Sequence, residues 1–134
     1  MEGLEVAVNL LAGSDMVVVG LQEMIELSTN NVVSSNEEDS EVSTAWERAI
    51  QRFLNTSQRK FIFVQKIEMV GLLSMVFIAD RWKHAIKGVQ RDSVKTGMGG
   101  QFGNKGSVVL RVRIFETSLC FACCHLTAGY SKIA

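Results

Sequence analysis

Three short parts of the sequence carry groups that could bind and act on a phosphate group. Glu23 follows one apolar run, Lys105 lies in the glycine-rich segment 97–106, and His125 ends a second apolar run. A carboxylate is a hard oxygen ligand of the kind that Mg²⁺ accepts. A glycine segment presents free backbone amides beside a lysine ammonium, and an imidazole gains or loses a proton near neutral pH. Together these groups predict a phosphate-handling site at the edge of a sheet.

Each of these features also has a purely structural interpretation, and the residues alone leave both open. Glu23 could be a surface glutamate at the end of a strand, and segment 97–106 could be a plain hairpin connection. The segment is not a nucleotide-binding P-loop, because it lacks a Gly-Lys-Ser/Thr triplet with a glycine five residues before it. What remains is a flexible backbone beside Lys95, Asn104 and Lys105, which could present amides and ammonium groups to an anion.

Three cysteines stand just before His125, namely Cys120, Cys123 and Cys124. Zinc is one interpretation, but a structural zinc site needs a second ligand pair, and the other histidine of the chain is His84. Strand alternation also places Cys124 on the face opposite Cys123 and His125. We therefore favour the interpretation that the three cysteines are small apolar residues of the core. Cysteines crowded in this way cannot pair with distant partners, which fits a reducing compartment and predicts a cytoplasmic protein.

Charge and hydropathy exclude some classes of protein. The 134 residues contain 14 basic and 14 acidic side chains, so the chain is not a polybasic nucleic-acid binder or a basic membrane-surface helix. Its apolar runs are far shorter than the roughly 20 residues of a transmembrane helix, so we expect no transmembrane segment. The apolar content of 47% is ample for a core, and phosphate recognition must come from a few local groups.

Hydrophobic periodicity predicts the elements that would position the site. We expect a helix near residues 4–11, a strand over 15–21 covered on both faces, and a polar loop over 28–41. A capping box at 44–47 predicts a helix to about Asn55, with one apolar face formed by Trp46, Ile50, Phe53 and Leu54.

The sequence of the second half of the chain predicts mainly strands. Residues 61–64 and 72–79 are β-prone on either side of Val70-Gly71, and 81–91 predicts a loop with a short strand. In 107–115 apolar residues alternate with Arg111 and Arg113, and 119–126 returns as the partner strand after a turn at 116–118. No internal repeat or domain boundary is evident.

Taken in order, these segments resemble the inositol polyphosphate 5-phosphatase family of the endonuclease/exonuclease/phosphatase (DNase I-like) superfamily. The similarity extends from about residue 4 to 129, and its most specific part is the Gly-Asn-Lys-Gly block 103–106. The segments that carry it are Asp15 to Met24, Val94 to Gly100, 103–108, and His125-Leu126-Thr127-Ala128-Gly129.

The resemblance implies an α/β fold, a partial DNase I-like sandwich with a mixed sheet and flanking helices. It implies hydrolysis of the 5-phosphate of phosphoinositides or inositol polyphosphates, with Mg²⁺ as cofactor and no nucleic-acid partner. Glu23 would be the Mg²⁺ ligand and His125 would contact the scissile phosphate. The inositol-phosphate pocket would be shaped by Lys95, Asn104 and Lys105. The chain departs from the family at Cys123, where many members carry asparagine.

The family's catalytic domain is roughly twice as long, so the resemblance implies that residues 1–134 are its N-terminal portion. Later motifs of the family, which supply the water-activating base and further basic groups, do not occur in this sequence. We therefore expect the isolated chain to be inactive, with one layer of the sandwich built mostly from residues 60–126 and an inner apolar face left uncovered. The complete protein would contact membranes peripherally. Two alternatives remain: a non-catalytic phosphoinositide-binding or interaction module, and a nuclease of the same superfamily.

Overall fold

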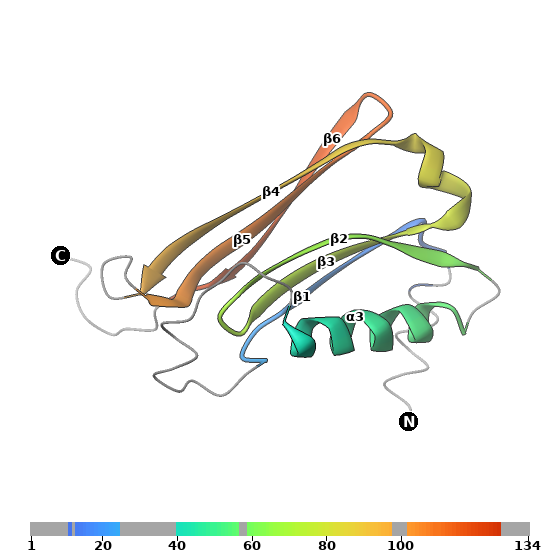
Figure 1. Cartoon of the computed structure of the whole chain (residues 1–134). Helices are drawn as coiled ribbons and strands as arrows, with labels where there is room; N and C mark the ends of the chain where they lie inside the picture. The colour runs from blue at the N-terminus through green and yellow to red at the C-terminus, as the bar shows by residue number, and fades with distance from the viewer. Residues whose placement is uncertain (1–10, 12, 25–39, 57–58, 98–101, 127–134) are drawn as a thin grey trace.

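The computed structural model describes residues 11, 13–24, 40–56, 59–97 and 102–126 (Figure 1). The predicted helix near 4–11 and most of the predicted loop over 28–41 lie outside these residues. The described elements are strands β1 (Met16–Leu21), β2 (Phe61–Met69), β3 (Leu72–Ala79), β4 (Ile86–Gly97), β5 (Phe102–Ile114) and β6 (Thr117–His125), with helix α3 (Glu41–Leu54) and the short 3₁₀ helix η1 (Asp80–Ala85).

The strands form two three-stranded sheets, ordered β1-β3-β2 and β4-β5-β6, and every pairing among them is antiparallel. Figure 1 shows the two sheets as separate layers, with α3 along the outer side of the first. The predicted α/β sandwich is confirmed. The expectation that residues 60–126 build a single layer was wrong, because η1 redirects the chain from the first sheet into the second.

The two sheets cover each other's apolar faces. All eight residues of β3 are buried, and Val108, Leu110 and Val112 of β5 lie in the same core. Burial of this kind stabilises a fold by about 25 cal/mol for each Å² of apolar surface removed from water. The expected uncovered inner face is therefore not found among the described strands.

Strand β1 lies at the edge of the first sheet, not at its centre. It pairs with β3 alone among the described strands, and of its residues only Val17 is buried. Both of its faces are packed, because Val17, Val19 and Leu21 contact the core on the α3 side and Met16 and Val18 contact the core between the sheets, so the predicted covering of both faces is confirmed. A continuous apolar run does not distinguish an edge strand from a central one, and here the central position belongs to β3.

The second sheet follows the predicted alternation closely. Arg111 and Arg113 are exposed on its outer face, while the apolar residues between them point into the core. The turn before β6 lies at Phe115 and Glu116, so β6 begins slightly earlier than predicted. Strand β4 is far longer than the short strand predicted within 81–91, because it pairs with β5 over most of its length.

Helix α3 begins at Glu41, four residues before the predicted start. Its N-cap is Ser40, whose Oγ accepts a hydrogen bond from the Ser43 backbone amide at 3.1 Å. Ser40 is itself fixed by β2, since its backbone N and its Oγ donate to the Glu68 carboxylate at 2.9 and 3.0 Å. The prediction that α3 begins at a capping box at 44–47 was wrong. The helix begins earlier because Glu68 holds Ser40, and these two residues lie 28 positions apart in sequence.

The packed face of α3 also differs from the prediction. Ile50, Phe53 and Leu54 pack into the core, but Trp46 is 43% exposed. Instead, Glu47 and Thr44 contact the ammonium of Lys66 on β2, at 3.0 and 3.2 Å. The side chain of Lys66 is only 3% exposed, so this ion pair lies between helix and sheet.

Among the described residues, no helix has the length and apolar character needed to cross a membrane.

Candidate functional site

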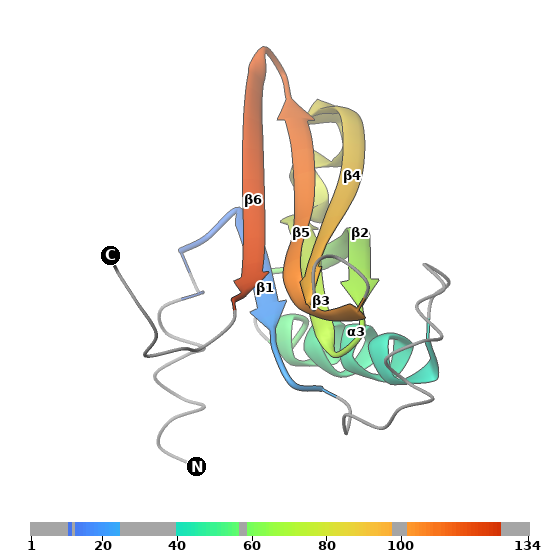
Figure 2. The same ribbon diagram turned by 90° about the vertical axis from the view of Figure 1, so that its left-hand side faces the viewer.

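The site lies where the ends of β1 and β6 meet, at the edge between the two sheets. Both strands run in the same direction and end side by side in Figure 2. Glu23 follows β1, and His125 is the last residue of β6. The Oε1 atom of Glu23 lies 3.5 Å from Nε2 of His125. Two residues 102 positions apart in sequence are thus brought within reach of one small ligand.

Lys105 supplies the third group of the site. Its Nζ atom lies 2.6 Å from Nε2 of His125, whose side chain is 14% exposed. An ammonium group can only donate, so the ring nitrogen must accept. The site therefore contains an ammonium, an imidazole and a carboxylate.

Lys95 lies in the same row of the second sheet as His125. Gly106 on β5 is paired with Lys95 on one side and with His125 on the other. Gly106 has φ +150, and a Cβ atom there would lie 2.0 Å from the backbone oxygen of Val94. Only glycine allows β4 and β5 to approach this closely, which brings Lys95 and His125 into one row across the sheet.

The glycine-rich segment is the connection between β4 and β5. Gly97 pairs with Phe102 at the end of this hairpin, which agrees with the hairpin interpretation, while Lys105 beside it contributes to the site. The backbone of Asn104 lies within β5, and its side chain is outside the described residues.

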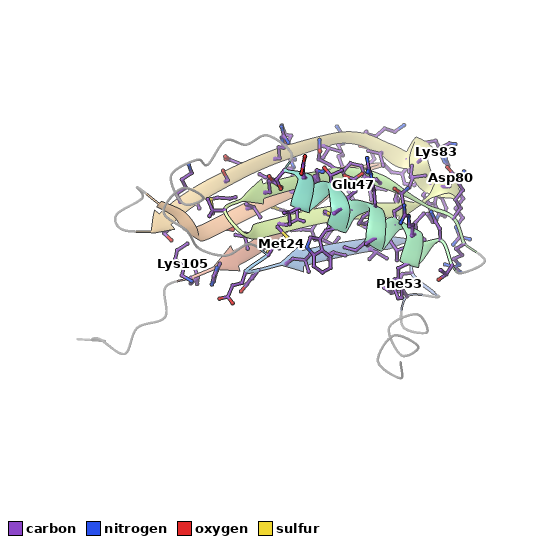
Figure 3. The ribbon with its side chains drawn as sticks, turned by 60° about the horizontal axis from the view of Figure 1, so that its bottom comes forward. Met24, Glu47, Phe53, Asp80, Lys83 and Lys105 are labelled. Atoms are coloured by element: carbon purple, nitrogen blue, oxygen red, sulfur yellow. The ribbon has the colours of Figure 1, made fainter. Side chains whose placement is uncertain are left out.

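The backbone around Glu23 is held in an unusual conformation. Glu23 has φ 57, a left-handed value that is uncommon for residues other than glycine. After it, the backbone amide of Met24 donates to the carbonyl of Gly71 in the β2–β3 turn at 3.1 Å. Before it, Nε2 of Gln22 donates to the carbonyl oxygen of Cys124 at 2.6 Å. In Figure 3, Lys105 lies toward one end of the molecule, and Asp80 and Lys83 toward the other.

Sequence reasoning did not single out Gln22. Its partner is 102 residues away, so no local pattern could have revealed the bond. The only signal was its position directly before a candidate ligand.

The three cysteines are free thiols. Cys123 and His125 are both partly buried, whereas Cys124 is exposed and bonds Ser107 at 3.2 Å, so the predicted alternation is confirmed. Burial is the main cause that raises the pKa of the Cys123 thiol, which keeps it protonated and unreactive. Within the described residues, no group of three or more histidine, cysteine or acidic side chains could hold a metal ion.

A cavity of about 200 Å³ lies at the other end of the sandwich. It is mostly apolar and is lined by Asp15, Met16, Ile78, Trp82, Ile114 and Phe115. These residues lie at the start of β1, at the end of β3, in η1 and at the end of β5, so the cavity is separate from Glu23 and His125.

The arrangement is suited to a phosphate and a divalent cation. Lys105 can pair with an anion, and the side chain of Glu23 is 75% exposed and open to a cation. Mg²⁺ is commonly held by one or two carboxylates, with water and substrate phosphate completing its shell. One exposed carboxylate beside a lysine ammonium fits this mode and does not fit an all-protein cage.

Comparison with known proteins identifies the family and the fold of this chain. The family described as endonuclease/exonuclease/phosphatase family 2 matches residues 8–134. Human synaptojanin-2 is 38% identical over 120 residues, which cover 90% of this chain and 8% of that protein. The inositol-1,4,5-trisphosphate 5-phosphatase 1 of Schizosaccharomyces pombe is 36% identical over 122 residues, covering 89% of this chain and 11% of that protein. The chain thus spans about a tenth of the length of these relatives.

A solved structure extends the similarity to the fold. The inositol polyphosphate 5-phosphatase domain of SpSynaptojanin, in complex with inositol (1,4)-bisphosphate and a calcium ion, superposes with a TM-score of 0.72 at 32% identity. The match covers 90% of this chain and 33% of that one. Sequence and structure agree over nearly the whole chain, and the chain belongs to the endonuclease/exonuclease/phosphatase family.

Proposed function

We propose that this chain forms part of the catalytic domain of a Mg²⁺-dependent phosphatase that removes the 5-phosphate of phosphoinositides or inositol polyphosphates. The observation that carries the proposal is the convergence of Glu23, Lys105 and His125 at one sheet edge. The relatives named as 5-phosphatases and the inositol bisphosphate bound by the structural neighbour support the substrate class.

Each residue has a role that follows from its chemistry. The ammonium of Lys105 binds the phosphate, and Lys95, in the same row of the sheet as His125, adds a second cation to the pocket. Once Lys105 turns to the phosphate, Nε2 of His125 no longer accepts from the ammonium, and as a protonated ring nitrogen it would donate to the same group. Donors aimed at a phosphoryl group stabilise the charge that develops on it during transfer. Asn104, next to Lys105 in β5, adds to the inositol-phosphate pocket.

Glu23 would hold the magnesium ion. When bound, the ion supplies neutralisation of phosphate charge and orientation of the substrate. Glu23 is suited to this role because its carboxylate projects into solvent, while the backbone that carries it is fixed on both sides.

The described residues contribute one candidate metal ligand and no evident water-activating base. We therefore propose that turnover needs the longer protein, and that the 134-residue chain alone is inactive. We propose a cytoplasmic location, which the free cysteines support, with peripheral contact to membranes when the substrate is a lipid.

The test measures phosphate release by the full-length protein that contains this sequence, with the 134-residue chain assayed beside it. Substrates are inositol trisphosphate and vesicles containing a 5-phosphorylated phosphoinositide, each with Mg²⁺ or EDTA. Glu23→Gln and His125→Ala should each lower kcat/KM at least about 100-fold, in the range found for removal of one transition-state donor. The matched control is Glu116→Gln, since Glu116 is an exposed carboxylate on the distal hairpin.

Three results would contradict the proposal: Mg²⁺-independent turnover, full activity of Glu23→Gln, or turnover by the 134-residue chain alone. Cleavage of abasic-site DNA without phosphoinositide hydrolysis would favour the nuclease alternative. Phosphoinositide binding by a full-length protein that hydrolyses neither substrate would favour the non-catalytic module.

A further inference from the structure

We propose that Gln22 is a positioning residue, whose side chain fastens the end of β1 to the end of β6 and so sets the separation of Glu23 and His125. The inference rests on the proposed function, because it assigns a role in that same site. It depends on one hydrogen bond, from Nε2 of Gln22 to the backbone oxygen of Cys124 at 2.6 Å.

The first step concerns the two sheets. β1 belongs to the sheet β1-β3-β2 and β6 to the sheet β4-β5-β6. Among the described strands, no backbone ladder joins β1 to β6, so strand pairing does not fix how their ends align. Glu23 follows one strand and His125 ends the other. The separation of these two residues must be set by contacts that cross between the sheets.

The hydrogen bond of Gln22 is such a contact, and its place is specific. Gln22 directly precedes Glu23, and Cys124 directly precedes His125. The bond thus joins the side chain of the residue before Glu23 to the peptide unit that precedes His125. The acceptor lies on an edge strand, since β6 is an outer strand of its sheet. Carbonyl groups on the outer side of an edge strand have no partner in the sheet and are free to accept from another group.

The close packing beside this bond supports the same interpretation. Gly20 lies two residues before Gln22, and a Cβ atom built on it would lie 3.0 Å from Sγ of Cys123. Glycine at position 20 therefore lets β1 lie directly against β6. The approach of the backbones brings the Gln22 amide within reach of the Cys124 carbonyl.

The backbone anchors matter because the carboxylate of Glu23 is not held by packing. Its side chain is 75% exposed, so its position depends on where its Cα is placed. Gln22 fixes the chain before it to β6, and the amide of Met24 fixes the chain after it to Gly71. Glu23 is thereby held at φ 57 between two anchors, one on each sheet.

The orientation of the amide follows from elementary chemistry. A carbonyl oxygen can only accept, so the NH₂ group of Gln22 must face Cys124. Methionine has nearly the same length and shape but no donor, and it adds no charge next to Glu23. Gln22→Met therefore removes the bond with little change of volume.

The test compares Gln22→Met with Gln90→Met in the full-length protein. Gln90 is also an exposed glutamine with one hydrogen bond, since its Oε1 accepts from Arg111 at 3.1 Å, but it lies on the outer face of β4 away from the site. Removing a group that orients a metal ligand typically costs 10- to 100-fold in metal affinity or activity. We expect Gln22→Met to lower kcat/KM by about that factor and to raise the Mg²⁺ concentration for half-maximal rate. For Gln90→Met, kcat/KM and the Mg²⁺ concentration for half-maximal rate should both stay within about twofold of those of the unsubstituted protein.

A double variant distinguishes a positioning role of Gln22 from a purely structural one. If Gln22 acts through Glu23, then Gln22→Met should cause no further loss in a Glu23→Gln background, whereas a general loss of structure would add to it. The melting temperatures of Gln22→Met and Gln90→Met should be similar. Unchanged rate and Mg²⁺ dependence in Gln22→Met, or full additivity with Glu23→Gln, would overturn the inference while leaving the proposed function intact.

A second readout does not depend on catalysis. Cys123 packs against Gly20 at the β1–β6 contact, so loosening the contact should raise its alkylation rate by iodoacetamide, measured by peptide mass spectrometry. Exposed Cys120 on β6 serves as the internal reference. We expect a faster Cys123 rate in Gln22→Met than in Gln90→Met, and equal rates would overturn the inference. If the unsubstituted protein proves inactive, the proposed function fails and this readout still decides the role of Gln22.

Discussion

The Nζ atom of Lys105 lies 2.6 Å from Nε2 of His125. This is also the ring nitrogen that lies nearest Glu23, at 3.5 Å. One atom of His125 therefore faces both a cation and a carboxylate, and the cation occupies its lone pair. A phosphate entering the site would compete with the imidazole for Lys105, which couples the binding of the anion to the release of the histidine.

Replacing Lys105 by methionine tests this coupling in the full-length protein. The change removes a charge-assisted hydrogen bond to the phosphate, worth about 1.5–3 kcal/mol. We therefore expect kcat/KM to fall by about 10- to 100-fold, with a weaker dependence of KM on ionic strength. Steady-state kinetics at two salt concentrations measure both effects. The control is Lys83→Met, an exposed lysine on η1 that pairs with Asp80 at the far end. Equal kinetics for the two variants would exclude a binding role for Lys105.

The sequence predicted those parts of the fold that depend on local pattern. The alternation around Arg111 and Arg113 placed β5 with its correct inner face, and Val70-Gly71 marked the β2–β3 turn, where Gly71 has φ 76. The ends of two apolar runs correctly placed Glu23 and His125 at strand ends. Each of these signals is contained within a few neighbouring residues, which is why a single sequence was enough.

The features that could not be predicted depend on contacts between distant residues. Ser40 caps α3 because Glu68 of β2 holds it there, and β1 is an edge strand because β3 is its one partner among the described strands. Gln22 reaches Cys124 across the two sheets. In each case the partner lies on another element, so periodicity and capping patterns contain no information about it.

The contact between Gly20 and Cys123 gives a prediction about packing. Gly20→Ala would place a methyl group 3.0 Å from Sγ of Cys123, so β1 and β6 must separate slightly or the thiol must shift. Overpacking of this kind costs about 1–3 kcal/mol of unfolding free energy. Cys123→Ala removes the sulfur and should relieve the clash. Urea unfolding of both single variants and the double variant should give a coupling of at least about 0.5 kcal/mol in favour of the double. Simple additivity would show that the two residues are not in contact.

The ion pair between Glu47 and Lys66 gives a prediction about α3. Lys66 is 3% exposed, and its ammonium lies 3.0 Å from the Glu47 carboxylate. Removing one partner of a buried pair is strongly destabilising, by about 3–5 kcal/mol, whereas replacing both by apolar residues is often neutral. Glu47→Ala should therefore destabilise the protein far more than the double change Glu47→Leu with Lys66→Met. Denaturant unfolding of the two variants decides the point, and equal losses would refute it. Glu41→Ala, in the exposed first turn of the same helix, controls for helix propensity.

Asp15 gives a prediction about pH at the far end of the sandwich. A hydrogen bond from Arg81 is the main cause that lowers the pKa of this carboxyl from its ordinary value of 3.8, and the charge of Arg59 acts in the same direction, against partial desolvation. A carboxyl with a lowered pKa in the folded state stabilises the fold above its unfolded pKa, and this contribution is lost as the pH falls through the folded value. The unfolding free energies of the unsubstituted protein and of Asp15→Asn should therefore differ at neutral pH and converge between about pH 5 and pH 2. Arg81→Gln removes the principal partner and should show the same convergence. A difference that stays constant over this range would mean that the ionisation of Asp15 does not contribute to stability.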